Sequence, residues 1–287
     1  MDALQMQQKS QTSTKKPSFF GRMWRKQLIM PTEHGSWSWL VVPFLVGAII
    51  GDVRHWAVWL VFAGGFSVFL MRQPATVLYR IRRGRARKSD GPPATAWLFL
   101  LIVISIGSLI GLLIFKRAAL LWLMLPMAFV FGFYLVGSRR GRAGLRTLWM
   151  ELAGAIALAG MAPAAFIAAD GFLSLTAWML WLLMGLQNAL GAIYVRLRIA
   201  DTHQRPFHRI SIVWWHIGGC LIVVALQIGG WVPAGSFVPF AIFLIRAVWA
   251  FQRVRPVPNV KQFGFIEIGF ELLGGAWLVG VYWLAGF

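Results

Sequence analysis

Two glutamates near the start of the last apolar segment are the clearest candidates for chemistry. Glu267 and Glu271 are four residues apart, so on a helix they share one face. Two carboxylates that lie close together in a low-dielectric medium repel each other unless a cation or a proton intervenes. An arginine or histidine from a neighbouring helix, a divalent cation or a shared proton would each relieve this repulsion. A structural ion pair with Arg72 or Arg246 is the alternative to a functional site.

A further acidic position lies in the segment PTEHGSW, residues 31–37. Pro31 suits the first turn of a helix, and Glu33 would lie near the positive end of the helix dipole. His34 follows, and Gly35 leaves space for the close approach of another group. The Glu33–His34 pair could bind a polar head group or contribute to a metal site, although two ligands alone are too few for one. The alternative is a capped helix end with an interfacial tryptophan.

Two other apolar segments end in similar polar sequences, RQPATVLYRIRRG from Arg72 and LQNALGAIYVRLRIADTHQRP from Leu186. Both contain a glutamine, then proline or asparagine, then alanine, and later a tyrosine followed by spaced arginines. This match predicts an internal repeat whose equivalent polar ends border one cavity. We also expect Pro74 to break its helix and free backbone carbonyls for a ligand. The candidate ligand-binding residues are Arg72, Gln73, Tyr79, Asn188, Tyr194, Arg196, Arg198, Asp201 and, early in the next segment, His216.

The elements that must position these residues are long and apolar. Of the 287 residues, 59% are apolar and only 13% are charged, whereas soluble domains carry about 25% charged residues. The apolar residues fall in blocks near the ~20 residues that span a bilayer core. This composition excludes a soluble globular enzyme and a disordered chain. We therefore expect an all-α, multi-pass membrane protein located in the cell membrane.

We expect nine transmembrane helices between residues 31 and 287. Pro92-Pro93 and Pro256-Val257-Pro258 should separate helices, because proline begins or ends them. Residues 1–30 are polar and basic, without a signal peptide, and should form a disordered cytoplasmic tail on the anionic inner leaflet. The expected spans are 31–51, 56–79, 95–115, 119–137, 147–169, 173–195, 211–229, 233–252 and 262–286.

The basic residues sort strongly to one side of these nine segments. All 28 lysines and arginines fall on the side of the N-terminus except Arg54, Lys116 and Arg117. The positive-inside rule then predicts a cytoplasmic N-terminus and an outside C-terminus. It also explains the net charge of +19 without nucleic-acid binding. The polar intramembrane residues lie in the same half, which predicts a cavity open to the cytoplasm with membrane lipids as its partners.

The same residues carry a resemblance to known families. Nine helices, an inside N-terminus and polar inner ends on the second and sixth helices resemble the UbiA-type intramembrane prenyltransferases. PTEHGSW, RQP and the glutamate-rich start of the ninth helix resemble, more narrowly, the YwiC-like family, over residues 31–287. The UbiA resemblance implies a ring of helices around a central site that acts on a prenyl or lipid substrate.

One departure from the UbiA-type enzymes concerns their metal site. Those enzymes carry aspartate motifs on the second and sixth helices, which hold Mg²⁺ against the diphosphate leaving group. Here the second segment has no acid, and the sixth has only Asp201. Arg72, Arg80, Arg196 and Arg198 could hold an anionic group directly, since the guanidinium fork suits phosphate. Acids would then be supplied by the first and ninth helices.

Three classes of function follow. In the first, an intramembrane transferase binds an anionic head through its arginines, and four catalytic residues supply acid–base chemistry or hold one divalent cation: Glu33, His34, Glu267 and Glu271. In the second, a non-catalytic membrane subunit binds a protein partner or a cofactor. A haem between His34 and His216 is the example we consider. In the third, a small-anion transporter is disfavoured, because few polar residues would line an outer pathway.

Overall fold

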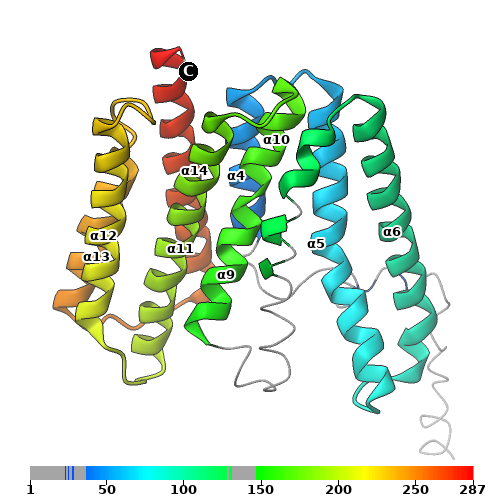
Figure 1. Cartoon of the computed structure of the whole chain (residues 1–287). Helices are drawn as coiled ribbons and strands as arrows, with labels where there is room; N and C mark the ends of the chain where they lie inside the picture. The colour runs from blue at the N-terminus through cyan, green and yellow to red at the C-terminus, as the bar shows by residue number, and fades with distance from the viewer. Residues whose placement is uncertain are drawn as a thin grey trace, which may run out of the picture. The chain divides into compact units, whose positions relative to one another are not determined.

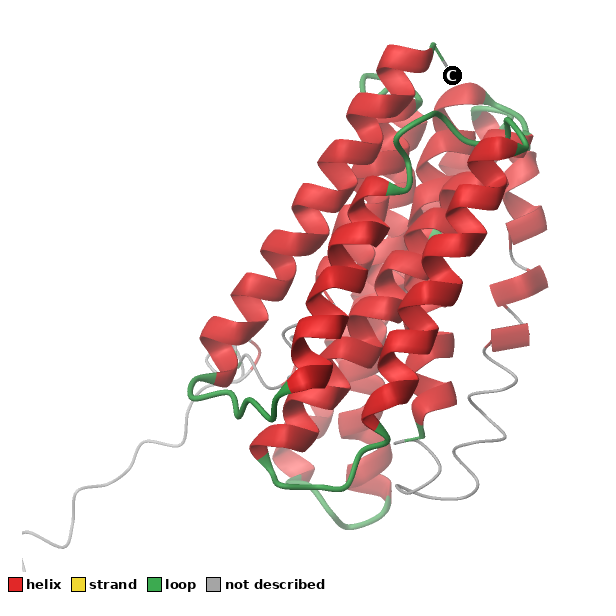
Figure 2. Cartoon of the chain, turned by 90° about the vertical axis from the view of Figure 1, so that its left-hand side faces the viewer, coloured by secondary structure: helices red, strands yellow, loops and turns green. Residues whose placement is uncertain are grey.

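The computed structural model describes residues 23, 25, 28, 37–123, 125–127, 129–130 and 147–286, and all regular structure in this part of the chain is helical (Figures 1 and 2). The expected all-α fold is therefore confirmed for these residues. The elements are α4 (Ser38–Ile50), α5 (Trp56–Arg82), η2 (Lys88–Asp90), α6 (Gly91–Ile114), η3 (Ala118–Leu123), α9 (Leu148–Ala159), α10 (Met161–Asp170), α11 (Leu175–Thr202), α12 (Arg209–Ile228), α13 (Val238–Gln252) and α14 (Val260–Ala285).

Among the described residues, six helical stretches are long and apolar enough to cross a membrane, which indicates a multi-pass membrane protein. Three shorter apolar stretches accompany them, Ser38–Ile50, Ala118–Met127 and Val238–Gln252. Each of the nine segments expected from the sequence overlaps one of these nine stretches. The six long stretches are Trp56–Arg82, Lys88–Ile114, Leu148–Asp170, Leu175–Thr202, Arg209–Ile228 and Val260–Ala285.

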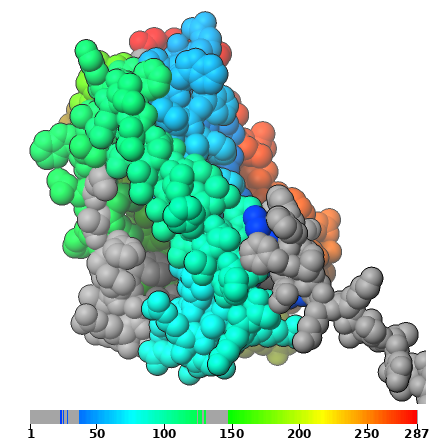
Figure 3. Space-filling view, turned by 90° about the vertical axis from the view of Figure 1, so that its right-hand side faces the viewer, coloured from blue at the N-terminus to red at the C-terminus, as the bar shows by residue number. Residues whose placement is uncertain are grey.

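The surface of α6 shows what such a helix presents to its surroundings. Along its length, Phe99, Ile106, Ile110 and Ile114 are each more than half exposed, and Figure 3 shows the face of the molecule that α6 contributes to. A row of large apolar side chains facing outward is costly in water and favourable in lipid. The exposure of α6 thus fits a helix that contacts the hydrocarbon of a bilayer.

The chain forms two compact units, one made of residues 1–32 and 67–103, the other of 33–66 and 104–287. In the first unit, the Trp97 indole N–H donates to the Met23 carbonyl at 2.8 Å. The part of α5 that belongs to this unit continues as a helix through Pro74. The expectation that Pro74 breaks this helix is therefore wrong. Proline removes only one helical N–H, and apolar helices tolerate this loss where other donors compensate.

In the second unit, α11 is the central helix and contacts α4, α9, α10, α12, α13 and α14. Its fully buried side chains include Leu183, Leu190 and Leu197. The last helix, α14, packs against α4, as expected for the ninth helix against the first. Gly275 permits this contact, because a Cβ there would lie 2.9 Å from Val42 Cγ1. Small residues at such crossings let helices approach closely where lipid offers no hydrophobic driving force.

Several expected boundaries differ from the structure; the segment 233–252, for example, begins only at Val238 as α13. The segment 147–169 is two helices, α9 and α10, separated at Gly160. The segment 119–137 begins as the 3₁₀-helix η3, and residues 131–137 lie outside the described part. The segment 173–195 continues to Thr202 as α11. Arg196, Arg198 and Asp201 are therefore helical, because burial of Leu197 and Ala200 extends the packed face beyond the apolar block.

The charged loops of the second unit lie at opposite ends of the bundle. The α11–α12 and α13–α14 loops are at one end, and the α10–α11 loop is at the other (Figure 1). Arg117 belongs to the second end, where its Nε donates to the Ala168 carbonyl at 2.7 Å and caps α10. His55, next to Arg54, contacts the same guanidinium. The sorting of Arg54 and Arg117 away from the basic α11–α12 and α13–α14 loops is thus reproduced within this unit.

Candidate functional site

A buried ion pair between α13 and α14 lies at the centre of the polar residues in the second unit. Arg246 Nη2 donates to Glu267 Oε1 at 2.5 Å, and the two side chains are only 14% and 12% exposed. A carboxylate can stay charged among apolar helices when a guanidinium is this close. Of the alternatives for Glu267, the structural partner Arg246 is the one observed, and no metal is needed to neutralise this carboxylate.

Aromatic rings enclose the same arginine. The Arg246 guanidinium carbon lies 3.7 Å from the centre of the Phe270 ring and 4.3 Å from that of Tyr194, with Phe243 at 5.6 Å. The negative faces of aromatic rings stabilise a cation that has lost water. Arg246 is therefore held by one carboxylate and three rings from α11, α13 and α14.

A second arginine, Arg198, shares the ring of Tyr194. Its Nη1 donates to the Tyr194 hydroxyl at 2.9 Å, and its Nε donates to the Arg255 carbonyl at 3.2 Å. The guanidinium also lies 5.1 Å from the centre of the Phe263 ring. Within the described part of the chain, Arg198 has no carboxylate at ion-pair distance, although it is half-buried. These contacts fix its orientation, and the Glu267 carboxylate acts on it at longer range than an ion pair.

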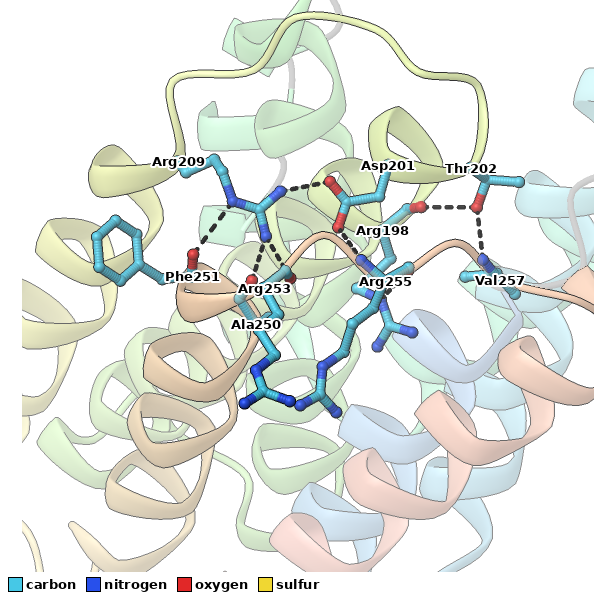
Figure 4. Close-up of polar contacts among 9 residues, drawn as sticks. All are labelled: Arg198, Asp201, Thr202, Arg209, Ala250, Phe251, Arg253, Arg255 and Val257. Atoms are coloured by element: carbon cyan, nitrogen blue, oxygen red, sulfur yellow. Dashed lines mark hydrogen bonds and ion pairs between the residues drawn. The ribbon is translucent and has the colours of Figure 1, made fainter.

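Asp201 has a structural role at the end of α11 (Figure 4). One carboxylate oxygen accepts from Arg209 Nη1 at 2.5 Å, and the other accepts from the Arg255 backbone N–H at 3.1 Å. Arg209 also donates to the carbonyls of Ala250, Phe251 and Arg253. These bonds tie the start of α12 and the end of α13 to the end of α11. Asp201 therefore positions its neighbours, and both of its oxygens are occupied.

Arg255 is the arginine that this arrangement leaves available. Its guanidinium carbon lies 3.2 Å from the centre of the Trp249 ring, and among the described residues it has no carboxylate partner. In Figure 4 the guanidinium groups of Arg198, Arg253 and Arg255 point to the same side of the α13–α14 loop. Two half-buried cations, Arg198 and Arg255, thus lie at one end of the bundle beside aromatic rings.

Glu271 lies one turn further along α14 and has a different environment. Its side chain is 5% exposed, and Ser38 and Trp39 of α4 hydrogen-bond its carboxyl group. Oε2 of Glu271 has no hydrogen-bond partner among the described residues, and neither has Oε1 of Gln187. Gln187 is 1% exposed, and its Nε2 donates to the Glu271 backbone carbonyl at 3.0 Å. This contact therefore holds two buried acceptor oxygens, Glu271 Oε2 and Gln187 Oε1, that receive no hydrogen bond from the described residues.

Three other expected site residues make structural contacts. Asn188 Nδ2 donates to the carbonyls of Trp39 and Ala155, at 2.9 and 3.0 Å, and so joins α11 to α4 and α9. Arg196 pairs with Glu151 of α9 at 2.8 Å. His216 is 1% exposed and its Nδ1 contacts the Ile212 carbonyl of its own helix at 2.8 Å. Their roles in ligand binding stay predictions.

The remaining candidates belong to other parts of the chain. Arg72, Gln73 and Tyr79 lie on the first-unit half of α5, with Arg72 and Tyr79 exposed. Glu33 and His34 lie outside the described residues. The structure brings together Tyr194, Arg198, Glu267 and Glu271 of the predicted set, and the described residues contain no group of three or more His, Cys, Asp or Glu that could hold a metal ion.

Sequence reasoning did not single out Arg255 or Gln187 as site residues. Arg255 precedes a proline in a basic loop, a position typical of a solvated charge. Gln187 lies beside Asn188 within an apolar helix, and the position of a polar residue in an apolar segment was the only feature of the sequence that pointed to it. Only the packing of α13 and α14 on α11 shows that both face the other polar residues.

Comparison with known proteins finds two matches to this chain. The family model described as YwiC-like protein matches residues 30–166. This range contains the PTEHGSW and RQP segments, whereas α11–α14 lie beyond it. A protein of Bacillus subtilis (strain 168) with the name "Uncharacterized protein YwiC" is 25% identical over 252 residues, covering 84% of this chain and 92% of the relative. No solved structure matches the chain. The two matches agree with the residues that carry the resemblance, and the chain is similar to the YwiC-like family over these parts of its length.

Proposed function

We propose that this protein acts on a membrane lipid or a prenyl compound with an anionic head group, which binds at Arg198 and Arg255. The observation that carries the proposal is that these two half-buried guanidiniums have no carboxylate partner among the described residues. Charge in an apolar environment is costly unless it is compensated. A phosphate or carboxylate head would supply that compensation through paired N–H donors.

The surroundings of the two arginines favour an anion with an apolar tail. Arg198 is held by Tyr194 and Phe263, and Arg255 by Trp249, so neither loses much side-chain freedom when an anion binds. Arg246 lies against the same Tyr194 ring, but its charge is balanced by Glu267. An anionic head at this end of the bundle would leave its tail among the apolar helices.

The finer architecture is part of the same proposal. Nine spans in a UbiA-like ring, with the basic loops in the cytoplasm of the cell and the tail on the anionic inner leaflet, would make this a head-group site open to the cytoplasm. Transfer chemistry on such a substrate would use Glu33, His34 and the glutamates of α14. The UbiA-type aspartate motifs are absent, so arginines would bind the leaving group in place of Mg²⁺.

The orientation can be measured with a reporter that is active only in the cytoplasm. The α13–α14 loop and the C-terminal end of α14 lie at opposite ends of the helix, which is 26 residues long. A reporter fused after Phe287 should be inactive, and the same reporter inserted in the basic α11–α12 loop should be active. An active reporter at the C-terminus would reverse the proposed orientation.

The anion site is tested by ligand-dependent thermal stability of the protein in detergent. We expect farnesyl diphosphate or phosphatidic acid to raise the unfolding temperature, because a ligand that binds only the folded state stabilises it. Phosphatidylcholine should have no effect. In R198Q and R255Q, the affinity should fall about 10- to 100-fold for each arginine, since a hydrogen bond to a charged group contributes about 1.5–3 kcal/mol.

R54Q is the matched control, because Arg54 is exposed, pairs with Asp52 and lies in the loop at the other end of α4. It should bind the ligands as the wild type does. Stabilisation by inorganic phosphate as strong as that by the lipids would favour a small-anion transporter. Release of diphosphate from farnesyl diphosphate with a hydrophobic acceptor would support the transferase, whereas no anion-dependent shift at all would refute the site.

A further inference from the structure

We propose that Glu271 and Gln187 form an intramembrane proton-binding site, in which Glu271 is a neutral carboxylic acid that donates a hydrogen bond to Gln187. This site does not depend on the anion site at Arg198 and Arg255. It rests on two buried side chains that each present an oxygen without a partner at the contact between α11 and α14.

The two oxygens need a donor. Oε2 of Glu271 and Oε1 of Gln187 are both acceptors, and each side chain is at least 95% buried. The amide of Gln187 already uses an N–H on the Glu271 carbonyl, which fixes the direction of its Oε1. Leaving two acceptors unpaired in an apolar interior costs free energy. One proton on Glu271 converts an acceptor into a donor and satisfies both atoms with a single hydrogen bond.

The backbone around the pair leaves room for this arrangement. At Gly274, one turn from Glu271, a Cβ would lie 2.9 Å from Gln187 Oε1. At Gly191, one turn from Gln187, a Cβ would lie 3.6 Å from Glu271 Oε1. Each polar side chain therefore packs against a glycine of the facing helix. This reciprocal packing brings the carboxyl and amide groups to facing turns of α14 and α11.

The charged groups around Glu271 do not supply the missing partner. On α14, Glu267 is a like charge, and its own ion pair occupies Arg246 of α13. From α11, the nearest titratable groups are Tyr194 and Arg198, which bond each other. The described residues of α4 contain no titratable group, and its neutral Ser38 and Trp39 hydrogen-bond the carboxyl group but leave Oε2 without a partner. A proton is thus the simplest ligand for Glu271.

Labelling with dicyclohexylcarbodiimide tests the protonation directly. This apolar reagent adds across a protonated carboxyl group, which gives up its proton to a carbodiimide nitrogen while the carboxylate oxygen bonds the central carbon. The O-acylisourea then rearranges to a stable N-acylurea. In purified protein at neutral pH, we expect one reagent per chain at Glu271, located by peptide mass spectrometry. Solvent-exposed carboxyl groups, such as that of Glu151, should stay unlabelled.

Matched variants separate the proposal from its alternatives. E271Q should lose the label, whereas E151Q, which changes an exposed carboxyl group, should keep it. Q187L removes the acceptor and should reduce labelling at neutral pH. Infrared spectra should show a protonated-carboxyl band that is absent in E271Q and shifted in Q187L, which tests the hydrogen bond even if a variant labels poorly. An unlabelled Glu271 without this band would overturn the proposal. Protection by Na⁺ would show a cation site in its place.

Discussion

Substitution of Gly47 by alanine is expected to lower the free energy of unfolding by more than about 3 kcal/mol, the upper range for overpacking a well-packed core. Gly47 lies on α4 where it crosses α10. A Cβ there would be 2.0 Å from the Ala162 carbonyl oxygen and 2.7 Å from its carbonyl carbon. These are backbone atoms, so relief requires one helix to move away from the other. We would measure the unfolding temperature and folded yield in detergent.

Gly154 provides the control for this prediction. It also lies within a helix of the second unit, but a Cβ there would meet nothing within 4 Å. G154A should be neutral or stabilise the protein by up to about 1 kcal/mol, because alanine favours helix over glycine. If G47A were as stable as G154A, the close crossing of α4 and α10 would be wrong.

Substitution of Glu267 by glutamine is expected to cost about 3–5 kcal/mol, the range for removing one partner of a buried ion pair. The change keeps the shape of the side chain but leaves the Arg246 guanidinium without a carboxylate among three aromatic rings. Thermal unfolding in detergent would measure the loss. The double variant R246M/E267M should recover most of it, because it removes the stranded charge together with its partner.

E151Q is the matched control, since Glu151 pairs with Arg196 at a similar distance but is 41% exposed. Exposed pairs contribute only about 0–1 kcal/mol. If E267Q and E151Q lowered stability equally, the Arg246–Glu267 pair would be open to water. If E267Q left stability unchanged but abolished the ligand-dependent shifts, Glu267 would belong to the binding site and not to the scaffold.

The sequence alone determined the class of this protein and the sidedness of its charge. Continuous blocks of apolar residues near the length of a bilayer core are expected to be helices. A helix satisfies its own backbone hydrogen bonds, which would otherwise be left unpaired in lipid. Lysine and arginine are scarce in alternate loops. This pattern predicted that Arg54 and Arg117 lie at the end of the bundle opposite the basic α11–α12 and α13–α14 loops. The PTEHGSW and RQP segments likewise carried the resemblance to the YwiC-like family, because such motifs are local.

Tertiary structure decided which polar residues meet. Glu267 and Glu271 look equivalent in sequence, since both lie on one face of α14. Packing places Arg246 of α13 against Glu267 and the Gln187 amide of α11 against Glu271. The two environments differ because a different helix crosses α14 at each of these turns. The sequence suggested that Asp201 binds a ligand, but in the structure its carboxylate bonds Arg209 and the Arg255 backbone N–H and so joins neighbouring elements. Arg255 looked like a solvated charge in a loop, but its guanidinium packs on Trp249 at the candidate site. These distinctions depend on contacts between residues far apart in the chain, which no local pattern encodes.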